Sequence, residues 1–143
     1  MLISTKGRYA LRVMIDLAEH PTSGYIPLKT IAERQQISEK YLESIIKLLV
    51  KQDLLLALRG KGGGYRLARA PEDYKVGDIL RITEESLASV SCLEVNAETC
   101  PMVSSCRTVA FWQGLDKVIN EYLDSKTIRD LMQTDDVGFD YVI

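Results

Sequence analysis

The pattern of apolar positions at the start of the chain is that of a surface helix. Between residues 6 and 19, apolar side chains recur every three or four positions, which predicts one amphipathic helix with basic residues in its first turns. The helix is expected to end at about residue 20, because the residue before Pro21 is pushed out of helical geometry.

Two further helical patterns follow, separated by only a few residues. The first begins after Pro27, which is tolerated at a helix start, and the second begins after Ser38, whose side chain is a favourable N-cap. The second pattern has its apolar positions on one face: Leu42, Ile45, Ile46 and Leu49. Two short helices with a tight connection and matching apolar faces are typical of a helix-turn-helix.

A hairpin pattern comes next, over residues 54–69. The apolar run LLLAL is compatible with a strand, RGKGGG cannot hold a helix, and YRLAR alternates in the manner of a second strand. This segment predicts a β-hairpin with a glycine-rich tip, which is the wing of a winged helix. The alternative of a phosphate-binding loop is disfavoured, since the G-x-x-x-x-G-K-[ST] pattern is absent and Gly64 leads into a strand.

The rest of the chain alternates between helix and loop. Residues 76–87 predict a short helix, whereas residues 88–106 lack periodicity and contain all three cysteines, so they are expected to form an ordered loop. A long helix follows, with a seam suited to pairing with a second copy: Trp112, Leu115, Ile119 and Tyr122.

The predicted fold is mostly α, a winged helix-turn-helix with a small β-hairpin wing and a long C-terminal dimerisation helix. We expect three regions along the 143 residues. Residues 1–81 form the DNA-binding domain, residues 82–106 form a connecting helix and the cysteine loop, and residues 107–143 form the dimerisation helix and a polar-then-apolar tail.

Charge is unevenly divided between the two parts of the chain. Residues 1–81 contain 14 lysines and arginines against 9 acidic residues, and residues 82–143 contain 4 against 11. A basic first part attracts a phosphate backbone, although ordinary scatter of surface charge is an alternative explanation. No apolar run approaches the ~20 residues of a membrane span and no signal region opens the chain, so we expect a cytoplasmic protein without a membrane partner.

The exposed face of the second helix of the pair carries groups that can contact DNA. If its apolar face points inward, helical geometry places Lys40, Glu43 and Ser44 outward, where they can contact base edges; the alternative is a solvated helix face. On the hairpin, Arg59 and Lys61 have the reach to enter a minor groove. The predicted DNA-contacting residues are Lys6, Arg8, Ser38, Lys40, Tyr41, Glu43, Ser44, Lys47, Arg59 and Lys61.

Three cysteines, Cys92, Cys100 and Cys106, lie within 15 residues of one another. Soft thiolates select zinc, copper(I) or iron–sulphur clusters, and the wide spacing favours a cluster over a single zinc ion. Unligated thiols and a disulfide switch are the alternatives. The single histidine, His20, is expected to be an ordinary residue at a helix end, and without a nucleophile–histidine–carboxylate set the chain is not expected to be an enzyme.

Four motifs together give the chain a family resemblance. STKGRYALR, ISEKYLE, RGKGGGYRLAR and VGDIL resemble the Rrf2 family of bacterial regulators, and the match extends to about residue 131. The resemblance implies a homodimer, mainly a repressor, that binds a double-stranded operator and whose long helix crosses its partner. It implies base contacts from Lys40, Glu43 and Ser44, a minor-groove contact from Arg59, and an iron–sulphur cluster held by the three cysteines.

The chain departs from two branches of this family at the fourth cluster ligand. One branch has a histidine where this chain has Val109, and another has an acidic residue near the N-terminus where this chain has Arg8. Glu94, Glu98 and a small-molecule thiol are the candidate substitutes, and two-iron and four-iron clusters are both compatible. A further branch implies an alternative without a cluster, in which a partner enzyme or thiol oxidation controls a regulator of cysteine or sulphur metabolism.

Overall fold

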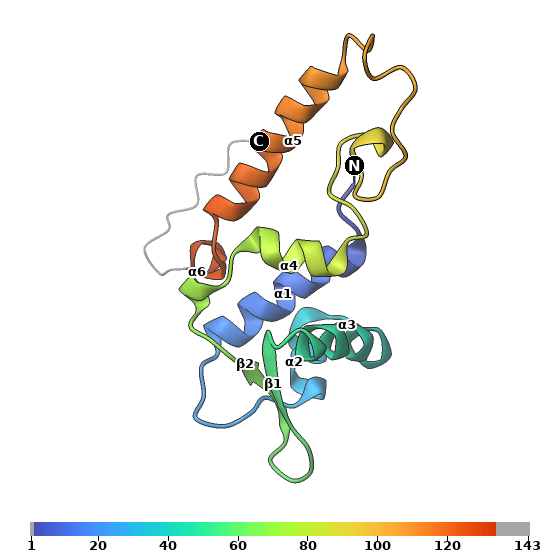
Figure 1. Cartoon of the computed structure of the whole chain (residues 1–143). Coiled ribbons are helices and arrows are strands. Elements are labelled where there is room, and N and C mark those ends of the chain that lie inside the picture. The colour runs from blue at the N-terminus through green and yellow to red at the C-terminus, as the bar shows by residue number, and fades with distance from the viewer. Residues whose placement is uncertain (1, 134–143) are drawn as a thin grey trace.

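The computed structural model describes residues 2–133, and its elements follow the predicted order (Figure 1). The elements are α1 (Thr5–Glu19), α2 (Leu28–Gln35), α3 (Glu39–Lys51), β1 (Leu55–Leu58), β2 (Gly64–Leu67), α4 (Val76–Thr83), α5 (Val109–Ser125) and α6 (Ile128–Leu131), with short 3-10 helices η1 (Pro71–Asp73) and η2 (Ser91–Leu93). The predicted class, mostly α with a two-stranded antiparallel hairpin, is confirmed. The predicted tail beyond residue 133 lies outside the described residues.

The first three helices form around one apolar core. Ser38 caps α3 as predicted, because its Oγ accepts a hydrogen bond from the Tyr41 backbone N–H at 3.3 Å. The predicted inner row of α3 is fully buried against α1 and α2: Leu42, Ile45, Ile46 and Leu49. Each such side chain contributes about 1.5–3 kcal/mol by leaving water, so this row fixes which face of α3 points outward.

The wing is a hairpin with an additional contact that the sequence does not reveal. Strands β1 and β2 pair antiparallel, with Leu55 opposite Leu67 and Leu58 opposite Gly64. Tyr65 also forms a β-bridge with Ile26, in the segment before α2. At Gly64 φ is 149°, and a Cβ there would collide with the Ile26 backbone, so this crossing requires glycine.

One tyrosine hydroxyl ties the base of the wing to the helical core. Tyr74 is 2% exposed, and its hydroxyl donates to the Leu54 carbonyl at 2.7 Å. The same oxygen accepts hydrogen bonds from the backbone N–H groups of Ala68 and Arg69, both at 2.9 Å. Because these groups precede and follow the hairpin, the tyrosine fixes both of its ends.

The helix α6 is an element that sequence analysis did not predict. Its Ile128 is fully buried in the same core as α1 and α3. Thr127 and Asp130 form a capping box at its start, and Thr127 also forms a β-bridge with Lys75. The chain therefore returns to the winged-helix core after α5, while the predicted division at residues 81 and 106 remains a prediction.

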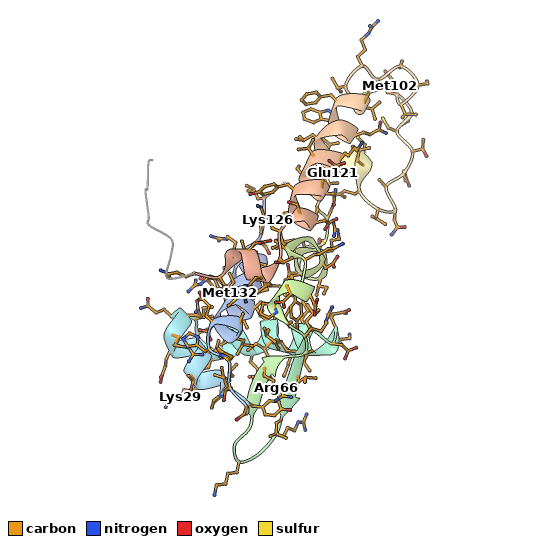
Figure 2. All side chains as sticks on the ribbon, turned by 90° about the vertical axis from the view of Figure 1, so that its left-hand side faces the viewer. Lys29, Arg66, Met102, Glu121, Lys126 and Met132 are labelled. Carbon is orange, nitrogen blue, oxygen red and sulfur yellow. The ribbon has the colours of Figure 1, made fainter. Side chains whose placement is uncertain are left out.

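The helix α5 projects from this core on the side away from the wing. Figure 2 shows Glu121 and then Met102 farther from the core, with Arg66 of the hairpin towards the opposite end. Residues 84–108, which contain the three cysteines, run between α4 and the far end of α5 (Figure 1). Within residues 2–133, none of the helices combines the length and apolar character that crossing a bilayer requires.

Candidate nucleic-acid interface and cysteine loop

The outward face of α3 presents the predicted base-contacting residues. Lys40, Glu43 and Ser44 are exposed, opposite the buried row. The Glu43 carboxylate lies 3.3 Å from the Lys47 ammonium, one helical turn later, so the lysine offsets a charge that would otherwise repel phosphates. The Ser44 hydroxyl donates to the Tyr41 carbonyl at 2.7 Å, which leaves its lone pairs available to an incoming donor.

The basic start of α1 lies next to the start of α3. The rings of Tyr9 and Tyr41 meet edge to face, with centroids 5.7 Å apart, and the Arg12 guanidinium lies 5.0 Å over the Tyr9 ring. Within the first turns of α1, Lys6 is half-buried and Arg8 is exposed. The two helix starts therefore form one continuous surface, and Tyr9 and Arg12 belong to it although the helical pattern alone did not single them out.

A buried carboxylate fixes α2 against α1. Asp16 is 1% exposed, and Arg34 donates to both of its oxygens, from Nε at 3.0 Å and from Nη2 at 2.5 Å. The Gln35 side chain donates to the same carboxylate at 2.8 Å. The hydrogen bond to Asp16 raises the pKa of Arg34 above its usual value, in spite of partial desolvation. Because a buried charge is tolerated only when it is paired and bonded, this network specifies how the end of α2 sits on α1.

His20 lies at the end of α1, as expected for an ordinary residue at a helix terminus. Its Nδ1 lies 2.8 Å from the Asp16 backbone carbonyl. This places the single histidine of the chain in an exposed position at the end of α1, whereas the cysteines lie on the segment between α4 and α5.

The wing and α3 enclose one cleft of about 610 Å³. Glu43 and Lys47 line it from the helix, and Arg59 lines it from the wing. Arg59 and Lys61 are both exposed at the tip of the hairpin. The structure thus brings together the two elements that the sequence predicts to contact DNA, with Lys6 and Arg8 near one end of α3 and the wing near the other end.

The three cysteines face a common pocket of about 220 Å³ between the loop and the start of α5. Cys92 and Cys106 are exposed and Cys100 is partly buried, and all three are free thiols. Across residues 2–133, no three side chains of His, Cys, Asp or Glu are already gathered closely enough to hold a metal ion. The thiols therefore share one site, and joint ligation requires the loop to draw their sulfur atoms closer together.

Cys106 lies beside hydrogen-bond donors at the start of α5. Its Sγ lies 3.5 Å from the Thr108 hydroxyl, at the N-terminal end of α5. Hydrogen bonds from the Thr108 side chain, then from the Thr108 and Val109 backbone, lower the pKa of the Cys106 thiol from its usual value. Since the thiolate is the form that binds metals, this end of the pocket favours ligation.

The candidates for a fourth protein ligand are separated by the fold. Glu98 lines the same pocket as the three cysteines, together with Gln113 of α5. Glu94 instead lines a different pocket, beside the N-terminal residues Ser4 and Lys6. The donor set facing the cysteine pocket, three thiols and a carboxylate, fits a soft metal or an iron–sulphur cluster.

The outer face of α5 is apolar, but its exposed row is rotated from the predicted seam. Of the predicted residues, Leu115 is 37% and Tyr122 63% exposed, whereas Trp112 and Ile119 are partly buried. Phe111 and Val118, which were not predicted, are 66% and 62% exposed. The exposed seam, defined by steps of four, three and four, consists of Phe111, Leu115, Val118 and Tyr122. Over its whole described length, α5 has no buried side chain.

Known proteins share this arrangement of sequence and fold. The Rrf2 profile, described as an iron-dependent transcriptional regulator, matches residues 3–134. The HTH-type transcriptional regulator IscR of Aliivibrio salmonicida is 37% identical over 137 residues, covering 96% of this chain and 80% of that protein. The solved structure of T. potens IscR is 42% identical, with a TM-score of 0.69, covering 92% of this chain and 85% of that one. CymR (YrzC), the global cysteine regulator of B. subtilis, is 36% identical, with a TM-score of 0.73, covering 92% and 95% of the two chains.

The fold and these similarities define a winged-helix, DNA-binding transcriptional regulator. The chain belongs to the Rrf2 family, as its four motifs predict, and is similar to both IscR and CymR. The individual DNA-contacting, cluster-binding and dimerisation residues stay predictions.

Proposed function

We propose that this protein is a homodimeric, cytoplasmic regulator whose operator binding is controlled by an iron–sulphur cluster on Cys92, Cys100 and Cys106. The observation that carries the proposal is the placement of all three thiols on one pocket, in a loop between the winged helix and α5. The single histidine, His20, is exposed at the end of α1, away from this pocket, and offers no competing site of comparable softness.

The residues that would hold the cluster are the three cysteines, with Glu98 as the neighbouring carboxylate. When bound, the cluster supplies a one-electron redox centre whose loss, gain or oxidation can be sensed. Hydrogen bonds from Thr108 lower the pKa of the Cys106 thiol, which favours the thiolate form that binds metals. The four-iron and two-iron forms need the same three protein sulfurs, so the proposal does not depend on nuclearity.

Dimerisation would use the exposed seam of α5. Four large apolar side chains at steps of four, three and four form the kind of stripe that packs against a second helix. Two copies related by a two-fold axis would present two α3 helices to a two-fold symmetric operator, with half-sites about one or more helical turns apart. Occupying such a site near a promoter blocks transcription, so we propose that the protein acts mainly as a repressor.

The cluster would control operator binding if it binds more tightly to one of two arrangements of the cysteine loop. A ligand shifts a conformational equilibrium only by its differential affinity for the two states. Since joint ligation requires the sulfurs to converge, cluster binding selects a more contracted loop than the one described above. That loop lies between the two helices α4 and α5, so its contraction acts on the angle between the winged helix and the dimer seam.

The first experiment is an iron and acid-labile sulphide assay with a visible absorption spectrum on anaerobically purified protein. A triple alanine variant of Cys92, Cys100 and Cys106 is the control. A coloured protein with stoichiometric iron and sulphide that loses both in the variant supports the proposal. A colourless protein that stays iron-free after attempted reconstitution contradicts the cluster and leaves the DNA-binding function intact.

The second candidate function is a cluster-free regulator of cysteine or sulphur metabolism, controlled by a partner enzyme or by thiol oxidation. The similarity to CymR, at 36% identity over 92% of this chain, favours it as the alternative. It predicts that the colourless protein changes its operator affinity after mild oxidation of its thiols, or on binding a partner enzyme.

A further inference from the structure

The N-terminus of α1 is tied to the end of α4 by one carboxylate, Glu84. The Ser4 backbone N–H donates to Glu84 Oε1 at 2.7 Å, and the Ser4 hydroxyl donates to the same oxygen at 3.0 Å. These two hydrogen bonds join residues that are 80 positions apart in the chain. Ser4 is also the N-cap of α1, since its Oγ accepts from the Gly7 backbone N–H at 3.1 Å.

The contact fits the electrostatics of a helix start. The first N–H groups of a helix carry partial positive charge, and a carboxylate placed there is stabilised. Gly7 allows the approach, because a Cβ at that position would lie 2.5 Å from Glu84 Oε1. The Glu84 carboxylate therefore occupies the space that a side chain at position 7 would otherwise fill.

The contact between Ser4 and Glu84 lies next to the cysteine loop. Glu84 is the C-cap of α4 and opens the segment that leads to Cys92. After that cysteine, the chain returns to the N-terminus, where Glu94 and Val95 line one pocket with Ser4, Lys6 and Glu84 itself. Figure 1 shows the blue start of the chain rising to the yellow segment that contains η2.

We propose that Glu84 is a positioning residue that ties the basic first turn of α1 to the cysteine loop. Through this joint, a rearrangement of the loop changes how Lys6 and Arg8 meet the DNA backbone. The proposal rests on the function proposed above for its regulatory part, whereas the positioning of Lys6 and Arg8 requires only that the protein binds DNA.

The direction in which DNA affinity changes on removal of Glu84 distinguishes a positioning role from a general electrostatic effect of its charge. Removing a negative charge near a DNA-binding surface strengthens phosphate attraction when charge alone matters. If Glu84 positions the two basic residues, its removal weakens binding instead. Phosphate contacts also set the slope of log K against log salt, by about 0.9 per contact, so the loss of one or two contacts is measurable.

The test measures the affinity of the full-length protein for a random-sequence duplex over a salt series. We expect Glu84→Ala to weaken binding and to reduce the magnitude of the salt slope by roughly 1 to 2, with no further reduction in a Lys6→Ala/Arg8→Ala background. Glu84→Gln, which keeps an acceptor oxygen for Ser4, is expected to restore most of the slope. Gly7→Ala is expected to behave like Glu84→Ala, because its methyl group displaces the carboxylate.

The matched control is Glu85→Ala, which removes the same charge from the adjacent residue. Stronger binding by both alanine variants, or an unchanged slope in Glu84→Ala, overturns the positioning role. A fold defect alone would lower the active fraction without changing the slope of the folded protein.

The regulatory part is tested by comparing cluster-loaded protein with its cluster-free form. We expect the ratio of their DNA affinities to approach one in Glu84→Ala and to be preserved in Glu85→Ala. An unaltered ratio in Glu84→Ala overturns the coupling. A wild-type protein that assembles no cluster contradicts the function proposed above and overturns the regulatory part with it, while the salt series still decides the positioning role.

Discussion

The Arg81 guanidinium on α4 holds both carboxylate oxygens of Asp124 on α5, at 2.8 and 3.1 Å. It also donates to the Asn120 side chain at 2.8 Å, one helical turn earlier. These bonds raise the pKa of Arg81 and lower the pKa of Asp124. The pair joins the winged helix to the long helix close to the point where α5 leaves the core, so it sets the angle between them.

This pair predicts a defined pH dependence of stability. The folded-state pKa of Asp124 lies below its ordinary value of 3.8, so its contribution is present above that value and is lost as pH falls through the folded-state pKa. We expect Asp124→Asn to lower the free energy of unfolding at neutral pH by at most about 1 kcal/mol, because both side chains are partly exposed. The difference from wild type should shrink towards zero in acid, as measured by urea unfolding across a pH series.

Glu121→Gln is the control for this experiment. Glu121 faces Lys117 at 3.9 Å on the exposed side of the same helix, where an ion pair contributes little. The control is expected to match wild type at every pH. A stability difference for Asp124→Asn that is equal at neutral and acid pH would contradict the assigned role of the ion pair.

Tyr74→Phe tests the anchor of the wing. The substitution keeps the ring but leaves the Arg69 N–H without its partner, and leaves the Ala68 N–H and the Leu54 carbonyl with only the 3.4 Å hydrogen bond that joins them to each other. We expect a loss of about 1–3 kcal/mol in the free energy of unfolding, since unsatisfied buried polar groups carry the full cost of desolvation. Tyr25→Phe, at a partly exposed ring beneath Arg66, should change it by less than about 0.5 kcal/mol. Equal stabilities of the two variants would show that the hydroxyl of Tyr74 does not anchor the hairpin.

Arg59→Ala tests the wing as a DNA contact. Arg59 is exposed at the tip and faces the cleft that it shares with α3, so its loss should weaken operator binding and reduce the salt slope by about 1. Sequence preference should relax at positions beside the half-site, where a narrow minor groove attracts arginine. Both are measured on an operator selected from a random-sequence pool, with Lys117→Ala on α5 as the charge-matched control. Unchanged affinity and unchanged sequence preference would rule out the wing contact.

The elements that the sequence predicted correctly are those with local signals. Pro21 ends α1, Ser38 caps α3, and the glycines of the hairpin exclude a helix, so each boundary is encoded within a few residues of itself. The four-residue helix α6 has a local start signal, the capping box of Thr127 and Asp130, but it is too short for an apolar periodicity that would predict a helix. It forms because Ile128 packs into a core built by earlier elements, from Ala10 of α1 to Ile79 of α4, and no local pattern encodes that contact.

The candidate site also has one part that local sequence signals predict and another part that they do not. The exposed face of α3 follows from helical geometry once its buried row is known, which is why the outward position of Lys40, Glu43 and Ser44 could be predicted, while their contacts with DNA stay predictions. The convergence of three thiols on one pocket and the contact between Ser4 and Glu84 depend on how a loop folds back, which spacing alone does not specify. The exposed row of α5 differs from the predicted seam because an apolar-rich helix offers two overlapping stripes at steps of three and four, and which of them meets a second copy stays a prediction.

The exposed seam of α5 predicts the effect of a charge on oligomeric state. Val118 is 62% exposed at its centre, between Leu115 and Tyr122. Val118→Glu places a carboxylate where a partner helix would otherwise exclude water, and burying an unpaired charge there costs more than an apolar contact contributes. We expect this variant to be monomeric by light scattering at concentrations where wild type is dimeric, and to lose most of its affinity for a two-fold symmetric operator. Lys117→Glu puts the same carboxylate one position away, outside the seam, and is expected to remain dimeric. A dimeric Val118→Glu protein would place the dimer interface elsewhere on the molecule.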